Sequence, residues 1–524
     1  MSYFSPSFSQ LFPKAAVSSI DPLASQAALD LIRHGGSAID AAIAANAVLS
    51  VTAPDQCGLG GDLVALVFCP PSSRGPAQVR SLQAIGHSGT GASADILRSQ
   101  GHGSIPRSSV QALTVPGAVD GWLALHQKFG RLRLDQVLDA AIDYATNGFP
   151  ASTRLRRNFE QLRGFASAAP LGDFLGSTSV QPLVRRPGVG RTLAAIAKLG
   201  REGFYAGEFG AELMKLGEGV FRPDDLATPI ARFSDPITST IFGHTLSTNP
   251  APSAGFLILG ALAQVDTAPT EVGNADWYIA LIEAFKKTAW MRAFHHDEID
   301  LNAVLTNTIP AAAPRTQTVA AGPDTTAITA VDTNGLGVVL VQSNGHAFGS
   351  RLATPDTNIF IHDRGAVGFN LVPGDANELQ PKKRPRHTLA PIIAQTPQGN
   401  LALLAGTMGG DRQPSILAQL VTGVLRDRLS PSDALVQPRF AFGSNSPSEL
   451  SGFDTFDGIE EPIVTCEEHL IPSVLSELTR RLGAVKSTPA YGSDSGVAHL
   501  IIRHPSGWVT ASDPRSEAVG VAGF

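Results

Sequence analysis

The first apolar pattern in the chain has the period of an α-helix. In the stretch LASQAALDLIRHGGSAIDAAIAANAVLSV, apolar residues recur every three or four positions on both sides of the sequence His34-Gly35-Gly36. Asp21-Pro22 is a typical helix start, and Ser37 is placed to cap a second helix after the glycines. Because Ala and Gly dominate both segments, they predict a helical hairpin that packs closely against a sheet.

Further helices and strands follow with clear boundaries. The run LVALVF after GLGGD predicts a buried strand, and a helix is expected from Val115-Pro116-Gly117 onwards. The other segments of helical period are TLAAIAKLGREGFYAGEFGAELMKLG, FLILGALAQV and ADWYIALIEAFKKTAWMRAFHHDE. A dinucleotide-binding fingerprint needs its glycines after a strand and before a helix. Here GLGG follows a helix and precedes a strand, which disfavours nucleotide binding and favours a simple turn.

The period changes from helical to alternating between Pro323 and Ser350. Two β-branched runs, AITAV and GVVLVQ, are joined by DTNG, and Asn-Gly between such runs predicts a β-hairpin. Thr325 then lies where a Pro- and Ala-rich loop enters the first strand. If the chain is cut before Thr325, this residue carries a free α-amine beside its own hydroxyl, which is a nucleophile and base in one residue.

The segments after this hairpin predict more strands and one glycine-rich turn. NIFIHDRGAVGF is expected to be a strand followed by a turn that carries Arg364, and APIIAQ and NLALLAG form a second hairpin. GTMGGDRQPSILAQLV predicts a strand, a turn and a helix with Pro414 in its first turn. Backbone amides at such a helix start can stabilise an oxyanion, so Gly409 and Gly410 are candidates for that role. Turn geometry alone also explains the two glycines.

Helices, strands and antiparallel hairpins in this order predict an α+β architecture with two stacked, mainly antiparallel sheets between helical layers. Length alone would allow about two to four domains. Only 16% of residues are charged and the net charge is −6, which argues against nucleic acid or an anionic membrane as partner. No apolar run approaches the length of a membrane span, and the N-terminus lacks a secretory pattern, so a cytoplasmic protein is expected.

The residue types that bind metals and cofactors form no strong motif. The three cysteines are odd in number and form no C-x-x-C pair, so neither a disulfide framework nor a zinc ribbon is expected. The cluster from His295 to Glu298 is interpreted as an exposed helix end, because adjacent histidines cannot share a helix face. The basic run from Lys382 to Arg386 is most simply a solvated loop. No metal and no cofactor is predicted.

The remaining chemistry is that of acyl transfer. The sequence contains no G-x-S-x-G, no H-E-x-x-H and no P-loop. What remains is the Thr325 hydroxyl at a strand entry, Ser343 and Asn344 on the paired strand, and a Gly-Gly turn at a helix start. These groups could supply a nucleophile, its base and oxyanion donors. The competing interpretation is that Thr325 is present only for its β-propensity.

A chain-wide resemblance favours the first interpretation. DTTAITAVDTNG, QSNGHAFGS, NIFIHDRG, KKRPRHTLAP, GTMGGDRQP, VPGAVDGW and SDPR together resemble the γ-glutamyltranspeptidase family of N-terminal-nucleophile hydrolases. The resemblance runs in order from about Ala15 to the C-terminus. It implies an αββα sandwich made as an inactive precursor, which cuts itself between Asp324 and Thr325. The large fragment (1–324) and the small catalytic fragment (325–524) would then remain associated as one domain.

The resemblance also implies roles for single residues. Thr325 matches the family's nucleophile, which forms an acyl-enzyme and passes the acyl group to water or to an amine. Ser343 matches the hydroxyl that hydrogen-bonds this nucleophile, and Gly409 and Gly410 match the oxyanion glycines. Thr326 is the neighbouring alternative, but the register through Val331-Asp332 favours Thr325.

Departures from the family pattern concern the substrate. Glutathione-cleaving members bind the glutamyl α-carboxylate with an arginine where the register places Ile85 in this chain. Their carboxylate for the α-amine falls where this chain has Gly365-Ala366-Val367-Gly368, and their double serine is replaced by His387-Thr388. A buried carboxylate and ammonium without partners would be strongly disfavoured. An ordinary glutathione hydrolase is therefore not expected.

The motifs R-P-x-H-T, Q-S-N and G-T-M-G-G-D are more similar to the cytoplasmic transpeptidase-like branch, which includes oxamate amidohydrolase. This similarity implies that Arg364 binds a substrate carboxylate, that Asn344, His387 and Thr388 line the substrate pocket, and that the basic loop frames it. The predicted function is hydrolysis of a small anionic amide, with a dimer of heterodimers as a possible assembly. The alternatives are a γ-glutamyl hydrolase or transferase, and a catalytically silent binding homologue.

Overall fold

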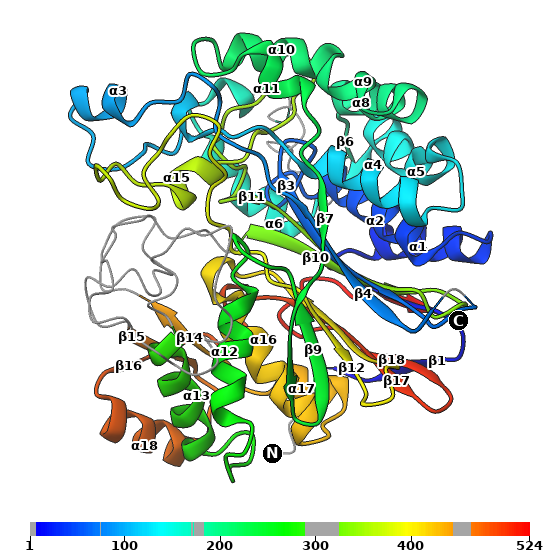
Figure 1. Cartoon of the computed structure of the whole chain (residues 1–524), viewed down its shortest axis with the longest axis vertical. Helices are drawn as coiled ribbons and strands as arrows, with labels where there is room; N and C mark the ends of the chain where they lie inside the picture. The colour runs from blue at the N-terminus through cyan, green and yellow to red at the C-terminus, as the bar shows by residue number, and fades with distance from the viewer. Residues whose placement is uncertain (1–6, 74, 169–170, 172–182, 289–323, 444–462) are drawn as a thin grey trace.

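The computed structural model describes residues 7–73, 75–168, 171, 183–288, 324–443 and 463–524. In this part of the chain, two sheets lie face to face and helices cover the outer face of each, giving four layers (Figure 1). The predicted αββα arrangement is therefore confirmed. It follows from the apolar runs of the strands, which are buried on both faces and so need one cover of helices and one of sheet.

The first sheet carries the predicted hairpin at its centre. Its strand order is β19-β2-β10-β11-β3-β4-β7, and all its pairs are antiparallel. The strands are β2 (Ala16–Ser18), β3 (Asp62–Cys69), β4 (Gln78–Ala84), β7 (Arg232–Ser234), β10 (Asp324–Val331), β11 (Gly337–Gly345) and β19 (Val521–Gly523). The strand β10 therefore lies in the interior of the molecule, and all eight of its residues are buried.

The second sheet has the order β1-β18-β17-β13-β12-β9-β8. Its strands are β1 (Gln10–Phe12), β8 (Ile237–Ile241), β9 (His244–Thr248), β12 (Ile392–Gln395), β13 (Leu401–Thr407), β17 (Ala498–His504) and β18 (Gly507–Thr510). Smaller sheets join β14 (Phe440–Gly443), β15 (Ile463–Glu467) and β16 (Val485–Thr488), and β5 (Phe149–Pro150) with β6 (Leu183–Val184). Both central sheets draw strands from distant parts of the sequence.

One helical layer covers the first sheet. It contains α1 (Pro22–Arg33), α2 (Ala38–Thr52), α4 (Ala118–Phe129), α5 (Leu134–Asn147), α6 (Thr153–Asn158) and α8 (Pro187–Leu199), with α3 (Ala94–Ser99), α9 (Glu202–Tyr205), α10 (Glu208–Leu216) and α11 (Pro223–Ala227) around it. The predicted break between the first two helices is confirmed: Ser37 caps α2, and its hydroxyl accepts from the Asp40 amide. Every residue of α2 is buried, so small side chains are required along its whole surface.

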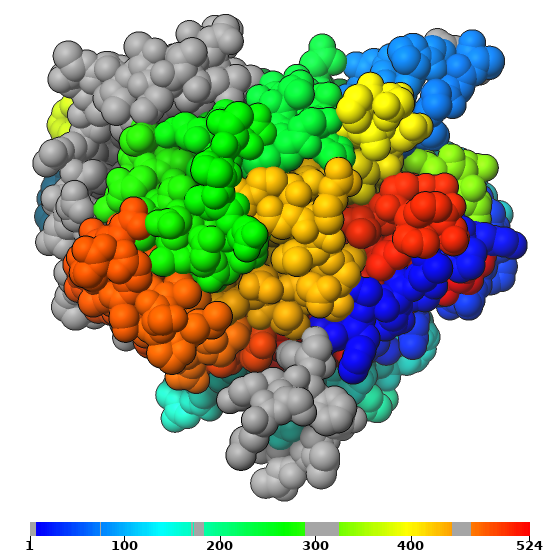
Figure 2. All heavy atoms as spheres, turned by 90° about the horizontal axis from the view of Figure 1, so that it is seen from below, coloured from blue at the N-terminus to red at the C-terminus, as the bar shows by residue number. Residues whose placement is uncertain are grey.

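The other helical layer covers the second sheet. Its members are α12 (Gly255–Val265), α13 (Ala275–Thr288), α16 (Gln413–Val421), α17 (Pro431–Val436) and α18 (Pro472–Leu482). Figure 2 shows these helices side by side on one face, with the N-terminal strand next to the C-terminal strands. Here β1 pairs with β18, so the first strand of the chain forms an edge of the second sheet beside a strand from near the C-terminus.

The core between the sheets consists of interlocking aliphatic side chains. Val64, Leu66 and Val339 from the first sheet meet Ile393 and Leu404 from the second. The two sheets approach each other closely at Gly406, where an added Cβ would lie 2.9 Å from Val339 and 3.1 Å from Ala327. This contact sets β13 directly against β10.

Two local predictions need correction or restriction. The segment NIFIHDRG is not a strand followed by a turn: it makes only single bridges, Ala353 to Phe360 and Gly60 to Ile361, and Arg364 starts a short helix, α15 (Arg364–Gly368). The apolar residues of this segment are buried between two different neighbours, the segments of Ala353 and of Gly60. The segment cannot form a continuous strand ladder with both of them. The cluster from His295 to Glu298 lies outside the described residues.

Candidate active site

Thr325 lies at the start of β10, where the ladder with β11 is irregular. Asp324 pairs with Gly345 and Thr326 with Gln342, so Thr325 sits within a bulge opposite Ser343 and Asn344. Its hydroxyl donates to Ser343 Oγ at 3.0 Å, and its residue is only 1% exposed. The bulge turns a side chain away from regular alternation, as bulges beside reaction centres often do. The sequence-predicted pair of Thr325 and Ser343 is therefore in direct contact.

Ser343 links the Thr325 hydroxyl to the carbonyl of the preceding residue. The Ser343 hydroxyl donates to the Asp324 carbonyl oxygen at 2.8 Å, and the Gly345 amide donates to Ser343 Oγ at 2.9 Å. The result is a continuous chain of hydrogen bonds from Thr325 through Ser343 to the carbonyl of the Asp324–Thr325 peptide bond. Such a chain can move a proton from an attacking hydroxyl to the oxygen of the carbonyl under attack.

Gly409 and Gly410 follow β13 at the end of the second sheet. Along this strand, Leu401 lies beside Gly337, at the far end of the hairpin, and Gly406 lies beside Ala327. The strand therefore runs toward the Thr325 end of β10 before it reaches the two glycines. Gly409 has φ +133° and Gly410 has φ +56°, values that favour glycine. The turn leads directly into the 3₁₀ segment Gly410–Arg412 and then α16.

Arg364, His387 and Thr388 come together in a buried cluster. Arg364 Nη1 is 3.5 Å from Thr388 Oγ1, and His387 Nε2 is 3.5 Å from Asp62 Oδ2. His362 Nδ1 approaches the same Asp62 oxygen at 3.6 Å. Burial and the nearby Arg364 charge lower the pKa of His387 to about 3, so this imidazole is neutral near neutral pH.

Asp62 at the centre of this cluster remains ionised. Burial raises its pKa, but the neighbouring His362 and His387 and the Gly86 amide outweigh that effect and lower it. Since His387 is neutral, the interaction is best described as a neutral imidazole beside a carboxylate. The GLGGD motif thus supplies an acid that the sequence analysis treated only as part of a turn.

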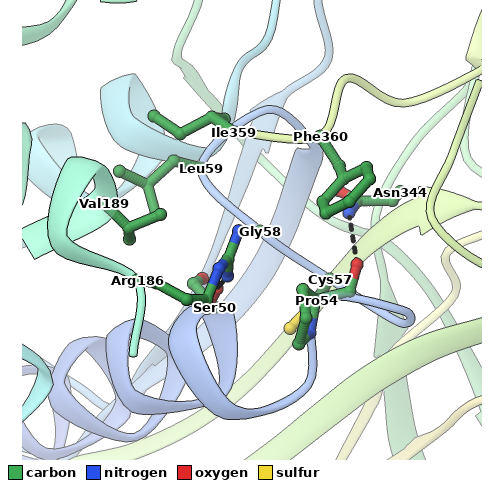
Figure 3. Close-up of a pocket in the computed structure, with 10 residues that line it drawn as sticks. All are labelled: Ser50, Pro54, Cys57, Gly58, Leu59, Arg186, Val189, Asn344, Ile359 and Phe360. Carbon is green, nitrogen blue, oxygen red and sulfur yellow. Dashed lines mark hydrogen bonds between the residues drawn. The ribbon is translucent and has the colours of Figure 1, made fainter. Parts of the chain in front are cut away.

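Asn344 is held from the helical side of the first sheet. Its amide nitrogen lies 3.5 Å from the Pro54 carbonyl oxygen, and its backbone amide donates to Gln56 (Figure 3). Asn344 and Pro54 line a small pocket together with Cys57 and Arg186. Asn344 Oδ1 has no hydrogen-bond partner among the described residues. A buried acceptor of this kind is available to a donor such as an ammonium group.

A second acid follows the histidine of the HDRG motif. Asp363 Oδ2 is 2.6 Å from His346 Nδ1 and 3.4 Å from Arg107 Nε. Burial opposes its ionisation, but His346 and the two nearby arginines, Arg107 and Arg364, lower its pKa well below the usual range. Asp363 therefore balances part of the positive charge of Arg364.

The Asp324 side chain has a charged partner of its own. Arg154 of α6 approaches Asp324 Oδ1 with Nη2 at 2.5 Å, and its Nε lies 3.8 Å from Asp55 Oδ2. Burial raises the pKa of Asp55 to about 6; Asp324 adds to this rise, while Arg154 opposes it. Three charged groups from three segments thus meet beside the predicted cleavage site.

Comparison with known proteins identifies the family. The family model for γ-glutamyltranspeptidase matches residues 24–523. The chain belongs to the γ-glutamyltranspeptidase family. It is 31% identical to an oxamate amidohydrolase proenzyme of Klebsiella pneumoniae, over 96% of this chain and 97% of that protein. It is also 31% identical to the glutathione hydrolase-like YwrD proenzyme of Bacillus subtilis, over 82% of this chain and 85% of that protein.

Solved structures support the same assignment. A cephalosporin acylase from Bacillus halodurans superposes with a TM-score of 0.86 and 25% identity, over 100% of this chain and 98% of that one. The γ-glutamyltranspeptidase-family chain is thus an N-terminal-nucleophile hydrolase in fold and an enzyme in class. The resemblance stated from the sequence motifs is confirmed.

The sequence did not predict three charged residues that lie in or beside the candidate site, namely Asp55, Asp62 and Arg154. Asp55 and Asp62 lie in PDQCGLGGD, which was interpreted as a turn, and Arg154 lies in an ordinary helical segment. Only the unusual density of acids and glycines between Pro54 and Asp62 could have marked that loop. Nothing local marks Arg154, which is 170 positions from its partner Asp324.

Three further features of the described residues concern metal binding, the Cys57 thiol and membrane-spanning helices. Within them, no group of three His, Cys, Asp or Glu side chains is arranged to hold a metal ion. Burial raises the pKa of Cys57 to about 12, so this thiol is not an alternative nucleophile. In the same part of the chain, no helix has the length and apolar character needed to cross a bilayer.

Proposed function

We propose that this family member is a self-processing amide hydrolase that acts through Thr325 on a small anionic amide. The observation that carries the proposal is the hydrogen-bond chain from the Thr325 hydroxyl through Ser343 to the Asp324 carbonyl oxygen. A threonine kept only for its β-propensity would not need this arrangement. The two relatives described above support the same chemistry, because both are named as proenzymes.

Self-cleavage would begin with attack of Thr325 Oγ1 on the Asp324 carbonyl carbon. Ser343 accepts the proton of the attacking hydroxyl and passes its own proton to the carbonyl oxygen, so little charge accumulates in the buried site. As the C–N bond breaks, the proton moves to the nitrogen of Thr325, which leaves as a free amine. Water then hydrolyses the Asp324–Thr325 ester, giving a carboxylate on Asp324 and the free hydroxyl and amine of Thr325.

Turnover would use the same hydroxyl with its own amine as base. The hydroxyl attacks the substrate amide, the amine of the substrate departs with a proton, and water releases the acyl group. Gly409 and Gly410 are proposed to donate backbone N–H groups to the oxyanion, because their strand carries them toward Thr325. We propose that Asn344 Oδ1, which has no hydrogen-bond partner among the described residues, accepts from the new amine of Thr325 or from substrate.

A small anionic substrate agrees with the residues around the site. Ile85, which occupies the place of the glutamyl-binding arginine, is 1% exposed and belongs to the apolar core between the sheets. Residues 365–368 form the rest of α15 and supply no carboxylate. We propose that Arg364 and Thr388 contact the anionic group, with neutral His387 as a wall of the pocket. The Klebsiella relative, named for oxamate, makes oxamate the first compound to test.

The proposal extends to the state of the protein. The fragments 1–324 and 325–524 share both sheets, since β10 and β11 lie between β2 and β3, and are therefore expected to stay associated after cleavage. We further propose a cytoplasmic location and a dimer of such heterodimers. The cytoplasmic assignment rests on the sequence pattern described above.

The decisive experiment is electrophoresis of purified protein with N-terminal sequencing of the smaller fragment. We expect conversion to two fragments with Thr325 at the new N-terminus, and no conversion in Thr325→Ala; Thr326→Ala is the matched control. A wild-type chain that stays intact, or cleavage elsewhere, contradicts the proposal and favours a silent binding homologue. An amide panel then identifies substrate: faster cleavage of a γ-glutamyl anilide than of oxamate would overturn the assignment of a small anionic amide.

A further inference from the structure

The residue before the cleaved bond is held as firmly as the nucleophile. Asp324 is 6% exposed, and its carboxylate lies 2.5 Å from Arg154 Nη2. Arg154 is itself 9% exposed and comes from α6, on the helical side of the sheet. A buried carboxylate on a buried guanidinium is restricted in position because either charge alone would be poorly solvated.

Other groups hold this guanidinium in place. Asp55 Oδ2 lies 3.8 Å from Arg154 Nε and accepts from Asn158 Nδ2 at 2.8 Å. The Arg154 backbone amide donates to Glu517 Oε2 at 2.8 Å. Asp55 in turn is fixed at the end of α2, where its carbonyl oxygen accepts from the Phe348 amide. Arg154 is thus held at two points: Asp55 contacts its side chain, and Glu517 accepts from its backbone amide.

The position of Asp324 matters because self-cleavage is a reaction between neighbouring residues. Thr325 Oγ1 must approach the carbonyl carbon of its own peptide bond, which regular strand geometry does not favour. The ladder is displaced between Asp324 and Thr326, so the reacting bond lies in the bulge. Two contacts hold this bond from opposite ends: Ser343 on the Asp324 carbonyl oxygen and Arg154 on the Asp324 carboxylate.

We propose that Arg154 is a positioning residue for self-cleavage, acting through the Asp324 carboxylate to hold the Asp324 carbonyl against the Thr325 hydroxyl. The inference rests on the proposed function of Thr325 and adds a second requirement to it. Once the Asp324–Thr325 bond is cut, the Asp324 carboxylate no longer has a carbonyl under attack to hold in place, so we assign this contact to maturation alone. Arg154 is needed for maturation and not for hydrolysis of substrate.

The test compares precursor disappearance in wild type, Arg154→Met, Arg154→Lys and Asp324→Asn. Misplacement of a reacting group by about 1 Å can cost roughly 100-fold in rate, and we expect Arg154→Met to slow cleavage by at least about tenfold. Arg154→Lys should recover part of the rate, because it keeps the charge without the planar fork. The double variant Arg154→Met with Asp324→Asn should be no slower than the slower single variant, because each substitution alone already removes the same contact between Arg154 and Asp324.

Controls separate positioning from stability and from the proposed function. Arg157→Met changes the last arginine of α6, whose exposed side chain lies 3.8 Å from Glu517, and should cleave like wild type. Thermal unfolding must show each precursor folded at the assay temperature. Hydrolysis is measured per mole of fragment beginning at Thr325, and Arg154→Met should stay within about threefold of wild type.

The outcomes distinguish the two proposals. If wild type cleaves at Thr325 and folded Arg154→Met cleaves at the same rate, the role of Arg154 is wrong while that of Thr325 stands. If Arg154→Met lowers hydrolysis per cut site as strongly as it lowers cleavage, Arg154 is a general structural residue and the inference fails. If wild type does not cleave at all, the proposed function fails first and the positioning role with it.

Discussion

Two regions of this protein bury several charges, and they do so in different ways. Between the small β14-β15-β16 sheet and the segment after β18, Arg439 and Arg515 meet Glu467 and Asp513, and every carboxylate oxygen in the group accepts a hydrogen bond. Arg515 Nε donates to Glu467 Oε1 at 2.8 Å, and Arg439 Nη2 donates to Asp513 Oδ2 at 2.6 Å. Backbone amides of Arg439, Ala498 and Arg515 complete the set. Here both carboxylates have partners at every oxygen, and only Arg439 Nε is without one among the described residues.

The region around Thr325 buries charges without saturating them. Asp55 Oδ1, Asp62 Oδ2 and Asn344 Oδ1 have no hydrogen-bond partner among the described residues. The pKa of Asp55 is raised to about 6 and that of His387 is lowered to about 3, each mainly by burial. Unpaired buried acceptors cost stability unless another group satisfies them at some stage.

The difference contrasts a paired ion cluster with the proposed site. Buried polar groups in folded proteins are nearly always satisfied, and the unsatisfied acceptors of Asp55, Asp62 and Asn344 agree with a site that binds a partner, while single unsatisfied atoms such as Trp277 Nε1 also occur far from it in the chain. In the C-terminal cluster, every oxygen of Glu467 and Asp513 already accepts a hydrogen bond from the chain, so neither carboxylate has an oxygen left without a partner. Three measurements test this contrast, beginning with the largest expected effect.

Arg515→Met should cause the largest loss of stability. It would leave Glu467 and Asp513 buried beside one another without their shared cation, and breaking a buried pair from one side costs about 3–5 kcal/mol. Chemical denaturation of the Thr325→Ala precursor with and without this change measures the difference without interference from cleavage. A loss below about 1 kcal/mol would mean that the saturated cluster is not structural.

Ser343→Ala should affect rate far more than stability. It removes the group that accepts from Thr325 and donates to the Asp324 carbonyl, and losing general acid–base help costs about 10²–10⁴-fold. We expect precursor cleavage to slow by about 100-fold while the unfolding free energy changes by about 1 kcal/mol. Ser343→Thr is the control that retains the hydroxyl. An equally fast Ser343→Ala precursor would exclude the proposed proton path.

Acid should destabilise the protein partly through His387. Its pKa is about 3 in the folded protein and near the ordinary 6.5 when unfolded, so the unfolded chain binds more protons in this interval. Stability therefore rises with pH across the window and is lost as pH falls below about 6.5, by roughly 2 kcal/mol at pH 5. His387→Gln should reduce the difference between pH 7.5 and pH 5 in denaturant titrations. Asp55 shifts in the opposite sense, and this contribution cancels in the comparison with wild type. An unchanged pH dependence would show that His387 is not held neutral.

Local structure followed closely from the sequence. The period of apolar residues located α1, α2 and the hairpin of β10 and β11. Ser37 marks the start of α2 and Gly335 marks the hairpin turn, because the geometry of both features depends on residues adjacent in the chain. Segment 358–368 was misjudged because its apolar residues serve two separate bridges, which no local pattern can distinguish from a strand. The family motifs pointed to Thr325 and Ser343, and the fold places them in contact.

Tertiary structure alone decided which charges meet at the site. Arg154 reaches Asp324, and His387 lies beside Asp62, because a helical layer and two sheets bring distant segments to the same strand ends. Such pairs depend on the relative placement of whole layers, and sequence spacing carries no information about it. The sequence by itself determined the elements and the candidate nucleophile. Packing determined the charged groups that surround it, because burial and distance set their pKa values and their partners.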